Sequence, residues 1–152
     1  MIQKEIRSWK KVFENDLNYI VYELKELVTT PTLILLEGPM GAGKTTFAKA
    51  FITLEGDESM SPSYSVVNET RNVVHADFYR LKSREEIIHL ELALYLEGKK
   101  YLFVEWGKQH FTSLLKELPE NFHLYLMELS INESSQNDIQ TRNFTLFEVS
   151  ES

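Results

Sequence analysis

The chain has 152 residues, of which 43% are hydrophobic and 26% are charged, a balance typical of one ordinary globular domain. It contains no cysteine, which excludes a disulfide framework, a thiolate nucleophile and a cysteine-ligated metal. The formal net charge is −7, whereas a domain that binds nucleic acid unaided usually presents a basic face. Tight, direct binding of RNA or DNA is therefore disfavoured.

The first residues mix charges among apolar positions, so they lack the apolar core of a signal peptide. No apolar run approaches the roughly 20 residues that a membrane span needs. We therefore expect a soluble, cytoplasmic protein without a membrane partner.

The predicted elements begin with a strand over residues 2–9, where apolar and polar residues roughly alternate. A helix follows, which Asn15 or Asp16 can cap and which Thr30-Pro31 ends. Its apolar face is formed by Leu17, Ile20, Val21, Leu24, Leu27 and Val28. The continuous apolar run at 32–37 is typical of a central parallel strand that is covered on both faces.

After a glycine-rich loop, Phe47, Phe51 and Leu54 continue at helical spacing, and Gly56 is suited to the position just past a helix end. The next 16 residues or so are polar and irregular with one short β-like piece, which is long for a passive connector.

Ser83 with Glu86 forms a capping box for a further helix that ends at Gly98. One side of this helix would carry Ile87, Leu90, Glu91 and Leu94, which is an imperfect core stripe. Further strands are predicted at residues 73–79, 101–104, 122–129 and 144–149, the last two as an antiparallel hairpin. The whole pattern, 1–152, predicts one α/β domain of the P-loop NTPase type with a mixed central sheet and helices on both faces.

The glycine-rich loop has the form G-x-x-x-x-G-K-[ST], running from Gly38 to Gly43-Lys44-Thr45. Glycines allow the backbone N–H groups to turn inward, and these groups and the helix N-terminus supply positive charge for phosphate oxygens. Lys44 can reach the β- and γ-phosphates, and the Thr45 hydroxyl can ligate Mg²⁺. The other reading, a glycine-rich turn with an exposed lysine, is disfavoured by the strand before the loop and the helix after it.

Two carboxylates lie at or near the ends of predicted strands. Glu105 comes directly after the apolar run 101–104, and Asp77 lies at or near the end of VVHAD. Ligands of open α/β sheets collect at the carboxyl ends of the strands, where phosphoryl chemistry needs an acidic residue. Either residue could instead be a surface or salt-bridged carboxylate.

Four stretches together resemble a known family. GPMGAGKTT (38–46), SPSYS (61–65), HADFYR (75–80) and VEW (104–106) resemble the TsaE family in order and spacing over roughly residues 15–130. The resemblance implies a P-loop ATPase of bacterial tRNA threonylcarbamoyladenosine synthesis, which binds ATP and Mg²⁺, hydrolyses ATP weakly alone and acts with the TsaB and TsaD proteins. It would meet tRNA only indirectly, which agrees with the acidic charge.

By position in that resemblance, Asp77 would orient or deprotonate the attacking water, Glu105 would hold Mg²⁺ directly or through water beside Thr45, and Trp106 would lie next to the nucleotide. Ser61 and Ser63 would belong to a switch near the γ-phosphate. Lys44, Asp77 and Glu105 are thus the expected catalytic residues. The nucleotide-contacting set is Gly38, Met40, Gly41, Ala42, Gly43, Lys44, Thr45, Thr46 and Trp106.

This sequence departs from the family pattern at Pro39-Met40, where the family usually has Asp-Leu. Pro39 has no N–H, so this loop position cannot donate to phosphate. Gly107 follows the tryptophan at a position where the family carries glycine, proline or other residues, so it neither supports nor weakens the resemblance. His75 reads more readily as a hydrogen-bonded strand histidine than as a catalytic one.

Three other functions stay open. A small-molecule kinase with a P-loop is the first alternative, although such kinases often supply lid arginines and this chain has only five arginines, which are scattered. A GTPase would need an element that reads guanine, and no Asn-Lys-x-Asp is present. A nucleotide-dependent binding protein without turnover would share the same loop.

Overall fold

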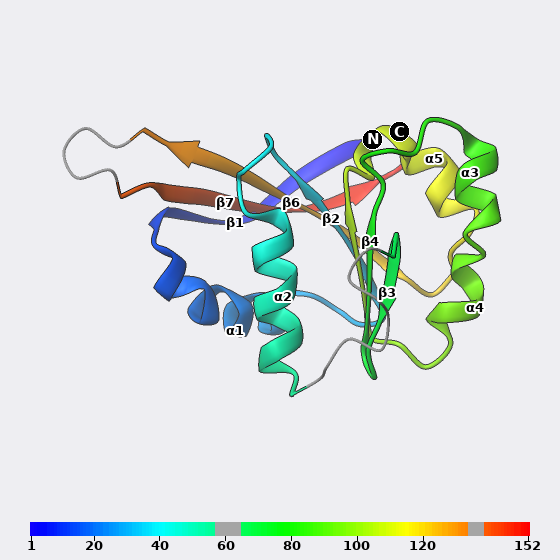
Figure 1. The fold of residues 1–152 in the computed structure, drawn as a ribbon, viewed down its shortest axis with the longest axis horizontal. Coiled ribbons are helices and arrows are strands. Elements are labelled where there is room, and N and C mark those ends of the chain that lie inside the picture. Colours follow the sequence, from blue (N-terminus) through cyan, green and yellow to red (C-terminus); the bar gives the residue numbers. More distant parts are fainter. Residues whose placement is uncertain (57–64, 134–138) are drawn as a thin grey trace.

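The structure of the chain is a computed structural model that describes residues 1–56, 65–133 and 139–152. Within these residues, seven strands form one sheet in the order β1-β7-β6-β2-β5-β4-β3 (Figure 1). The strands are β1 (Ile2–Val12), β2 (Thr32–Glu37), β3 (Val67–Glu69), β4 (Val73–Asp77), β5 (Tyr101–Glu105), β6 (His123–Asn132) and β7 (Thr141–Ser150). The predicted mixed sheet is confirmed, because β4, β5, β2 and β6 pair in parallel while β1, β7 and β3 pair antiparallel with their neighbours.

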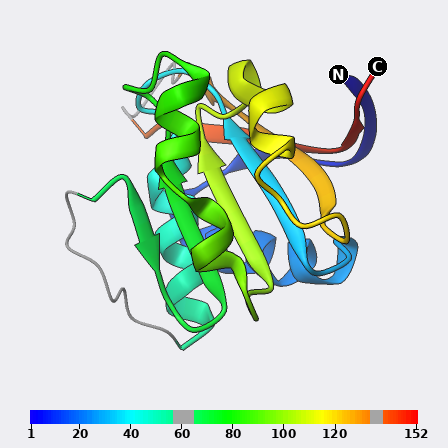
Figure 2. The ribbon, with the colours of Figure 1, turned by 90° about the vertical axis from the view of Figure 1, so that its right-hand side faces the viewer.

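Helices cover both faces of this sheet, as predicted (Figures 1 and 2). They are α1 (Leu17–Leu27), α2 (Lys44–Leu54), α3 (Arg84–His89), α4 (Leu92–Leu96) and α5 (Phe111–Leu115), with short 3₁₀ turns at Glu14–Asp16 and Lys108–His110. Successive residues of β2 alternate between two cores: Ile34 and Leu36 pack with α1 and α2, while Leu33 and Leu35 pack with α3, α4 and α5. Burial on both faces explains the continuous apolar run of this strand.

The helix predicted after Ser83 is present in two pieces. Ser83 caps α3 as expected, because its Oγ accepts the N–H of Glu86 at 3.3 Å. Glu91 then adopts a positive φ of 52°, which ends the helical register before α4 begins. The prediction that Leu94 faces the core is wrong: its side chain is 76% exposed, and Leu92 and Leu96 are buried instead. The imperfect stripe in the sequence reflects this break.

Neither α1 nor α2, at 11 residues each the longest helices in the described ranges, could cross a bilayer, and no other described helix could do so.

The parallel register sets the carboxyl ends of the central strands side by side. Asp77 of β4 pairs with Glu105 of β5, and Glu105 pairs with Leu36 of β2. The glycine-rich loop leaves β2 at this same edge and leads into α2. The sheet thus brings the loop and both predicted carboxylates to one place.

Candidate functional site

The loop from Gly38 to Gly43 turns sharply between β2 and α2. Gly41 and Gly43 have φ values of 83° and 101°, a left-handed conformation that favours glycine. Gly38 passes so close to β6 that a Cβ atom there would lie 2.4 Å from the carbonyl oxygen of Leu129. Two different constraints, conformation and space, therefore require glycine in this loop.

Pro39 contributes to the loop through its carbonyl. This oxygen accepts the N–H of Ala42 at 3.0 Å, which closes a tight turn. Across the described ranges, the N–H groups of Gly43, Lys44, Thr45 and Thr46 have no hydrogen-bond acceptor, and the first N–H of α2 that has one is that of Phe47. With the positive end of α2, these N–H groups form the part of the loop that is open to an anion.

Lys44 is folded back over its own loop. Its Nζ donates to the carbonyl oxygens of Gly38 at 2.6 Å and Pro39 at 3.1 Å, and lies 4.1 Å from the ring centroid of Trp106. The side chain is buried, and this burial lowers the pKa of Lys44, although the neighbouring carboxylates act in the opposite direction. An anion entering the loop would replace carbonyl dipoles with a full negative charge as the partner of this ammonium.

Glu105 is the centre of a buried polar group. The Thr45 hydroxyl lies 2.8 Å from both carboxylate oxygens, and His75 Nε2 lies 2.6 Å from Oε2. Burial alone would raise the pKa of Glu105, but these two hydrogen bonds and the charges of His75 and Lys44 lower it. The carboxylate is therefore held ionised while only 3% exposed.

The oxygens of Thr45 and Glu105 are suited to Mg²⁺, which prefers hard oxygen ligands and keeps some positions for water and phosphate. No group of three His, Cys, Asp or Glu side chains that could hold a metal occurs in the parts of the chain that the structure describes. The residues present thus fit a magnesium ion whose coordination is completed by a phosphate ligand, rather than an all-protein metal site.

A cavity of about 260 Å³ joins the loop to the strand ends. Asp77, Tyr79 and Trp106 line it together with the loop, with the rings of Tyr79 and Trp106 centred 5.2 Å apart. Asp77 is exposed, and its Oδ1 accepts the N–H of Tyr79 at 3.0 Å. One oxygen is thus held by the backbone while the carboxylate as a whole remains open to solvent.

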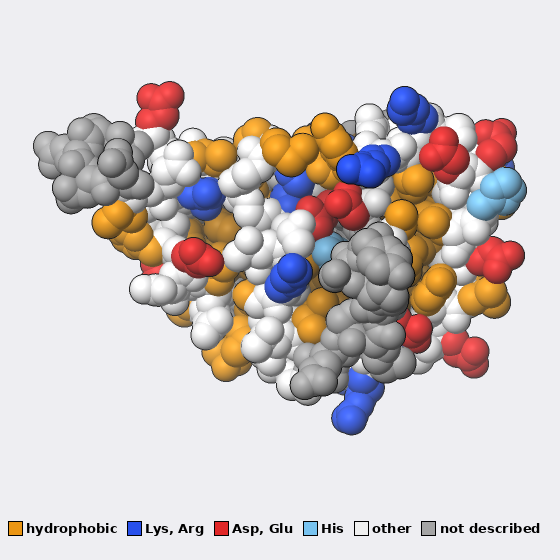
Figure 3. All heavy atoms as spheres, viewed as in Figure 1, with side chains coloured by type: hydrophobic (Ala, Val, Ile, Leu, Met, Phe, Trp, Pro, Cys, Tyr) orange, Lys and Arg blue, Asp and Glu red, His pale blue; other side chains and the backbone are white. Residues whose placement is uncertain are grey.

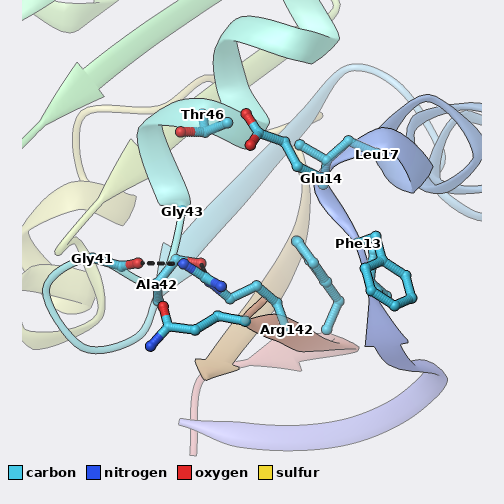
Figure 4. Close-up of a pocket in the computed structure, with 11 residues that line it drawn as sticks. Phe13, Glu14, Leu17, Gly41, Ala42, Gly43, Thr46 and Arg142 are labelled. Carbon is cyan, nitrogen blue, oxygen red and sulfur yellow. Dashed lines mark hydrogen bonds between the residues drawn. The ribbon is translucent and has the colours of Figure 1, made fainter. Parts of the chain in front are cut away.

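A second hollow, of about 160 Å³, lies on the other side of the same loop (Figure 4). It shares Gly41, Gly43 and Thr46 with the first cavity. Its other lining residues come from the end of β1 through the start of α1, from the loop itself and from the start of β7 and the residue before it, and they are Val12, Phe13, Glu14, Leu17, Ala42, Gln140, Arg142 and Phe144. The loop is thus the common wall between two hollows.

The surface around this loop combines apolar and charged groups. In the view of Figure 3, hydrophobic side chains gather along the upper edge of the molecule, next to a mixed group of acidic and basic side chains. Exposed apolar residues near the first cavity include Met40, 64% exposed, and Tyr79, 52% exposed.

Most residues predicted for the site converge on the first cavity. The structure brings together Met40, Gly41, Gly43, Lys44, Thr45, Thr46, Asp77, Glu105 and Trp106. Ala42 lines the second hollow, and Gly38 meets this group through its carbonyl on Lys44. Ser61 and Ser63, the predicted switch, lie outside the described residues.

Three residues have roles that the sequence did not indicate. His75 is the hydrogen-bonded strand histidine that the sequence favoured, but its partner is the site carboxylate Glu105. Gly107 leaves no room for a side chain, because a Cβ atom would lie 2.7 Å from Val104 and 2.8 Å from Leu35. Arg142 bonds the loop from the far end of the chain, and no signal in the sequence pointed to it, since it lies two residues before the predicted strand 144–149.

Comparison with known proteins relates the chain to one family. The family model for "Threonylcarbamoyl adenosine biosynthesis protein TsaE" matches residues 13–143. A tRNA threonylcarbamoyladenosine biosynthesis protein TsaE from Nostoc sp. is 32% identical over 124 residues, which cover 70% of this chain and 74% of the relative. The TsaE protein of Bacillus subtilis is 30% identical over 106 residues, which cover 66% of each chain.

A crystal structure of Bacillus subtilis YdiB shares the fold, with a TM-score of 0.54 and 23% identity over 99% of this chain and 89% of that one. This likeness supports the architecture, and the extent of the family match decides membership. The chain belongs to the TsaE family of threonylcarbamoyl adenosine biosynthesis proteins.

Proposed function

We propose that this member of the TsaE family binds ATP with Mg²⁺ and hydrolyses it, weakly alone and faster when it acts on a complex of TsaB and TsaD. The observation that carries the proposal is the meeting of Lys44, Thr45 and Glu105 beside loop N–H groups that lack acceptors among the described residues. A cation, a hydroxyl and an ionised carboxylate within one small cavity are the groups that a nucleotide triphosphate and its metal ion require.

The two hollows suggest how ATP would lie. The phosphates would cross the shared wall of Gly41, Gly43 and Thr46, with the γ-phosphate toward Glu105 and the nucleoside in the hollow beside Phe13. Phe13 is 48% exposed and offers an aromatic face to a base.

Hydrolysis would proceed by attack of a water oxygen on the γ-phosphorus as the bond to the bridging β,γ-oxygen breaks, giving ADP and phosphate. Asp77, exposed at the rim with one oxygen fixed by Tyr79, would orient this water and accept its proton. Lys44 would leave its two carbonyl partners and neutralise charge on the β- and γ-phosphate oxygens.

Thr45 and Glu105 would hold the metal ion, which supplies charge neutralisation at the phosphate oxygens when bound. His75 would keep the Glu105 carboxylate oriented toward Thr45 through its 2.6 Å contact. With Glu105 engaged by the metal ion and His75, Asp77 would be available to bind the attacking water.

The partner complex would hold the tRNA. The net charge of −7 gives the isolated chain little attraction for a polyanion, so the proposal includes weak binding of bare tRNA. A small-molecule kinase remains the alternative. Such a kinase would have to transfer phosphate although this chain places few arginines near the loop. Among the described residues that line the two hollows, the sole arginine is Arg142, which is engaged with loop carbonyls.

The test is ATP hydrolysis by the chain alone and with TsaB and TsaD, for the wild type and for Lys44→Ala. Lys49→Ala, which removes an exposed lysine from the same helix, is the matched control. We expect low activity alone, stimulation by the partners, loss in Lys44→Ala and no change in Lys49→Ala.

Equal activity with and without the partners would overturn the subunit role. Nucleotide binding without turnover under all conditions would favour the binding-protein alternative. Transfer of phosphate to a nucleoside in a coupled assay would favour the kinase.

A further inference from the structure

Arg142 reaches the phosphate-binding loop from a strand about 100 residues away in sequence. It lies near the start of β7, where its backbone pairs with Ile131 of β6 on one side and Val12 of β1 on the other. The side chain then crosses to the loop, where Nε donates to the Ala42 oxygen at 3.2 Å and Nη2 donates to the Gly41 oxygen at 3.1 Å (Figure 4).

These two bonds fix two consecutive peptide planes. A trans peptide is planar, so its N–H points away from its carbonyl oxygen. Because the Gly41 oxygen faces Arg142, the N–H of Ala42 points the other way, where the Pro39 oxygen accepts it at 3.0 Å. The Gly41–Ala42 peptide is thus held from both sides.

The next peptide is held from one side only. The Ala42 oxygen faces Arg142, so the N–H of Gly43 points away from the guanidinium. Within the described ranges this N–H has no acceptor. Gly43 has a φ of 101°, and the place of a Cβ on it faces open space. Ala42 is buried in the core, so the peptide is held by packing on the Ala42 side and by the bond of Arg142 to the Ala42 oxygen.

We propose that Arg142 is a positioning residue for phosphate binding: one edge of its guanidinium holds the carbonyls of Gly41 and Ala42 outward so that the N–H of Gly43 is presented to the phosphate. The inference rests on the proposed function, because it presupposes that this loop binds a nucleotide. The planar fork of arginine matches two adjacent acceptors, which a lysine ammonium cannot do with the same geometry.

Pro39 takes part in the same turn. The position has no N–H to offer to phosphate, but its carbonyl restrains the same turn that Arg142 restrains from outside. Preorganised N–H donors bind an anion more tightly than donors that must first be ordered.

The test measures binding of ADP and of inorganic tripolyphosphate by calorimetry to the full chain, for the wild type, Arg142→Ala and Arg142→Lys. The control is Arg71→Ala, which removes the same charge at an exposed turn before β4, at the opposite edge of the sheet. We expect Arg142→Ala to weaken the binding of both ligands by the same factor, about tenfold or more. Arg142→Lys should recover only part of the affinity, and Arg71→Ala should bind both ligands as the wild type does.

Amide signals report on the mechanism without any ligand. In nuclear magnetic resonance spectra of the free protein, we expect the N–H signals of Ala42 and Gly43 to shift in Arg142→Ala and to stay in place in Arg71→Ala. A merely structural role would lower the melting temperature of Arg142→Ala and leave both affinities unchanged, which would overturn the proposal.

Two further outcomes would also overturn it. Loss of affinity for ADP but not for tripolyphosphate would assign Arg142 to the nucleoside. Full affinity in Arg142→Lys would show that charge, not the fork, is what the loop needs. If the wild type bound neither ligand, the proposed nucleotide site itself would be refuted. This failure of the proposed function is distinguishable from failure of the Arg142 proposal, because it would already be seen in the unsubstituted protein.

Discussion

Gly38 offers a direct test of how the loop is built, through the substitution Gly38→Ala. The added Cβ would lie 2.4 Å from the Leu129 oxygen, which is a backbone atom of β6 and cannot move aside as a side chain would. Overpacking of this kind costs about 1–3 kcal/mol. The φ of 156° lies in a region sparsely used by other residues and adds about 1–3 kcal/mol. We expect a loss of about 2–6 kcal/mol in the free energy of unfolding.

Two other glycines separate these causes. Gly98→Ala places a side chain at a φ of 75° in open space, so it measures conformational cost alone, about 1–2 kcal/mol. Gly107→Ala has an ordinary φ of −88° but a Cβ 2.7 Å from a Val104 methyl group, so it measures crowding against side chains, about 1–3 kcal/mol.

The assay is urea and thermal unfolding of the three variants beside the wild type. In a chain of this size, a loss of 1 kcal/mol lowers the melting temperature by roughly 2–4 °C. Gly38→Ala should therefore melt roughly 10 °C below the wild type and lower than either control. If Gly38→Ala is no less stable than Gly98→Ala, the carbonyl of Leu129 does not oblige glycine here and the reasoning fails.

Three further predictions concern the site. In a Trp9→Phe background, binding of ADP should change the fluorescence of Trp106, because Lys44 would leave its place 4.1 Å from the centre of that ring. An unchanged spectrum at saturating ADP would contradict this displacement. Lys44→Met should abolish that response yet unfold at an equal or higher urea concentration, since burial lowers the pKa of Lys44 and makes its charge costly to fold. Burial also raises the pKa of Glu37, so the contribution of Glu37 to stability should fall as pH rises from the ordinary pKa of 4.5 through the raised folded pKa. Glu37→Gln should therefore gain in urea midpoint over the wild type at pH 7 and lose that gain at pH 4, whereas a gain independent of pH would point to another cause.

The sequence predicted the parts of the fold that depend on local pattern. The continuous run at 32–37 and the glycine loop after it both follow from rules about neighbouring residues, and the structure confirms both. The meeting of Glu105 and Asp77 at one edge of the sheet was predictable as well. It follows once both residues are recognised as the carboxyl ends of parallel strands.

The features that the sequence did not predict depend on contacts between residues that are distant in the chain. The break at Glu91 depends on which side chains find space against the sheet, and helical periodicity alone could not locate it. The role of Gly107 depends on the distance to Leu35, a residue 72 positions earlier. Arg142 touches the loop only because β7 lies beside β6 and β1 in the finished sheet. Contacts of this kind leave no periodic signal in the chain.

The side chains of Lys44 and Thr45 have hydrogen-bond partners within the protein. Lys44 is bonded to the carbonyls of Gly38 and Pro39, and the Thr45 hydroxyl is bonded to Glu105. A nucleotide and its metal ion would have to replace these bonds with new ones, which reduces the net free energy gained on binding. A partner that contacts the rim and favours the released positions of Lys44 and Thr45 would lower the cost of that exchange. Stimulation by a protein complex would then need no catalytic group from the partner, and we expect it to appear as tighter nucleotide binding as well as faster turnover.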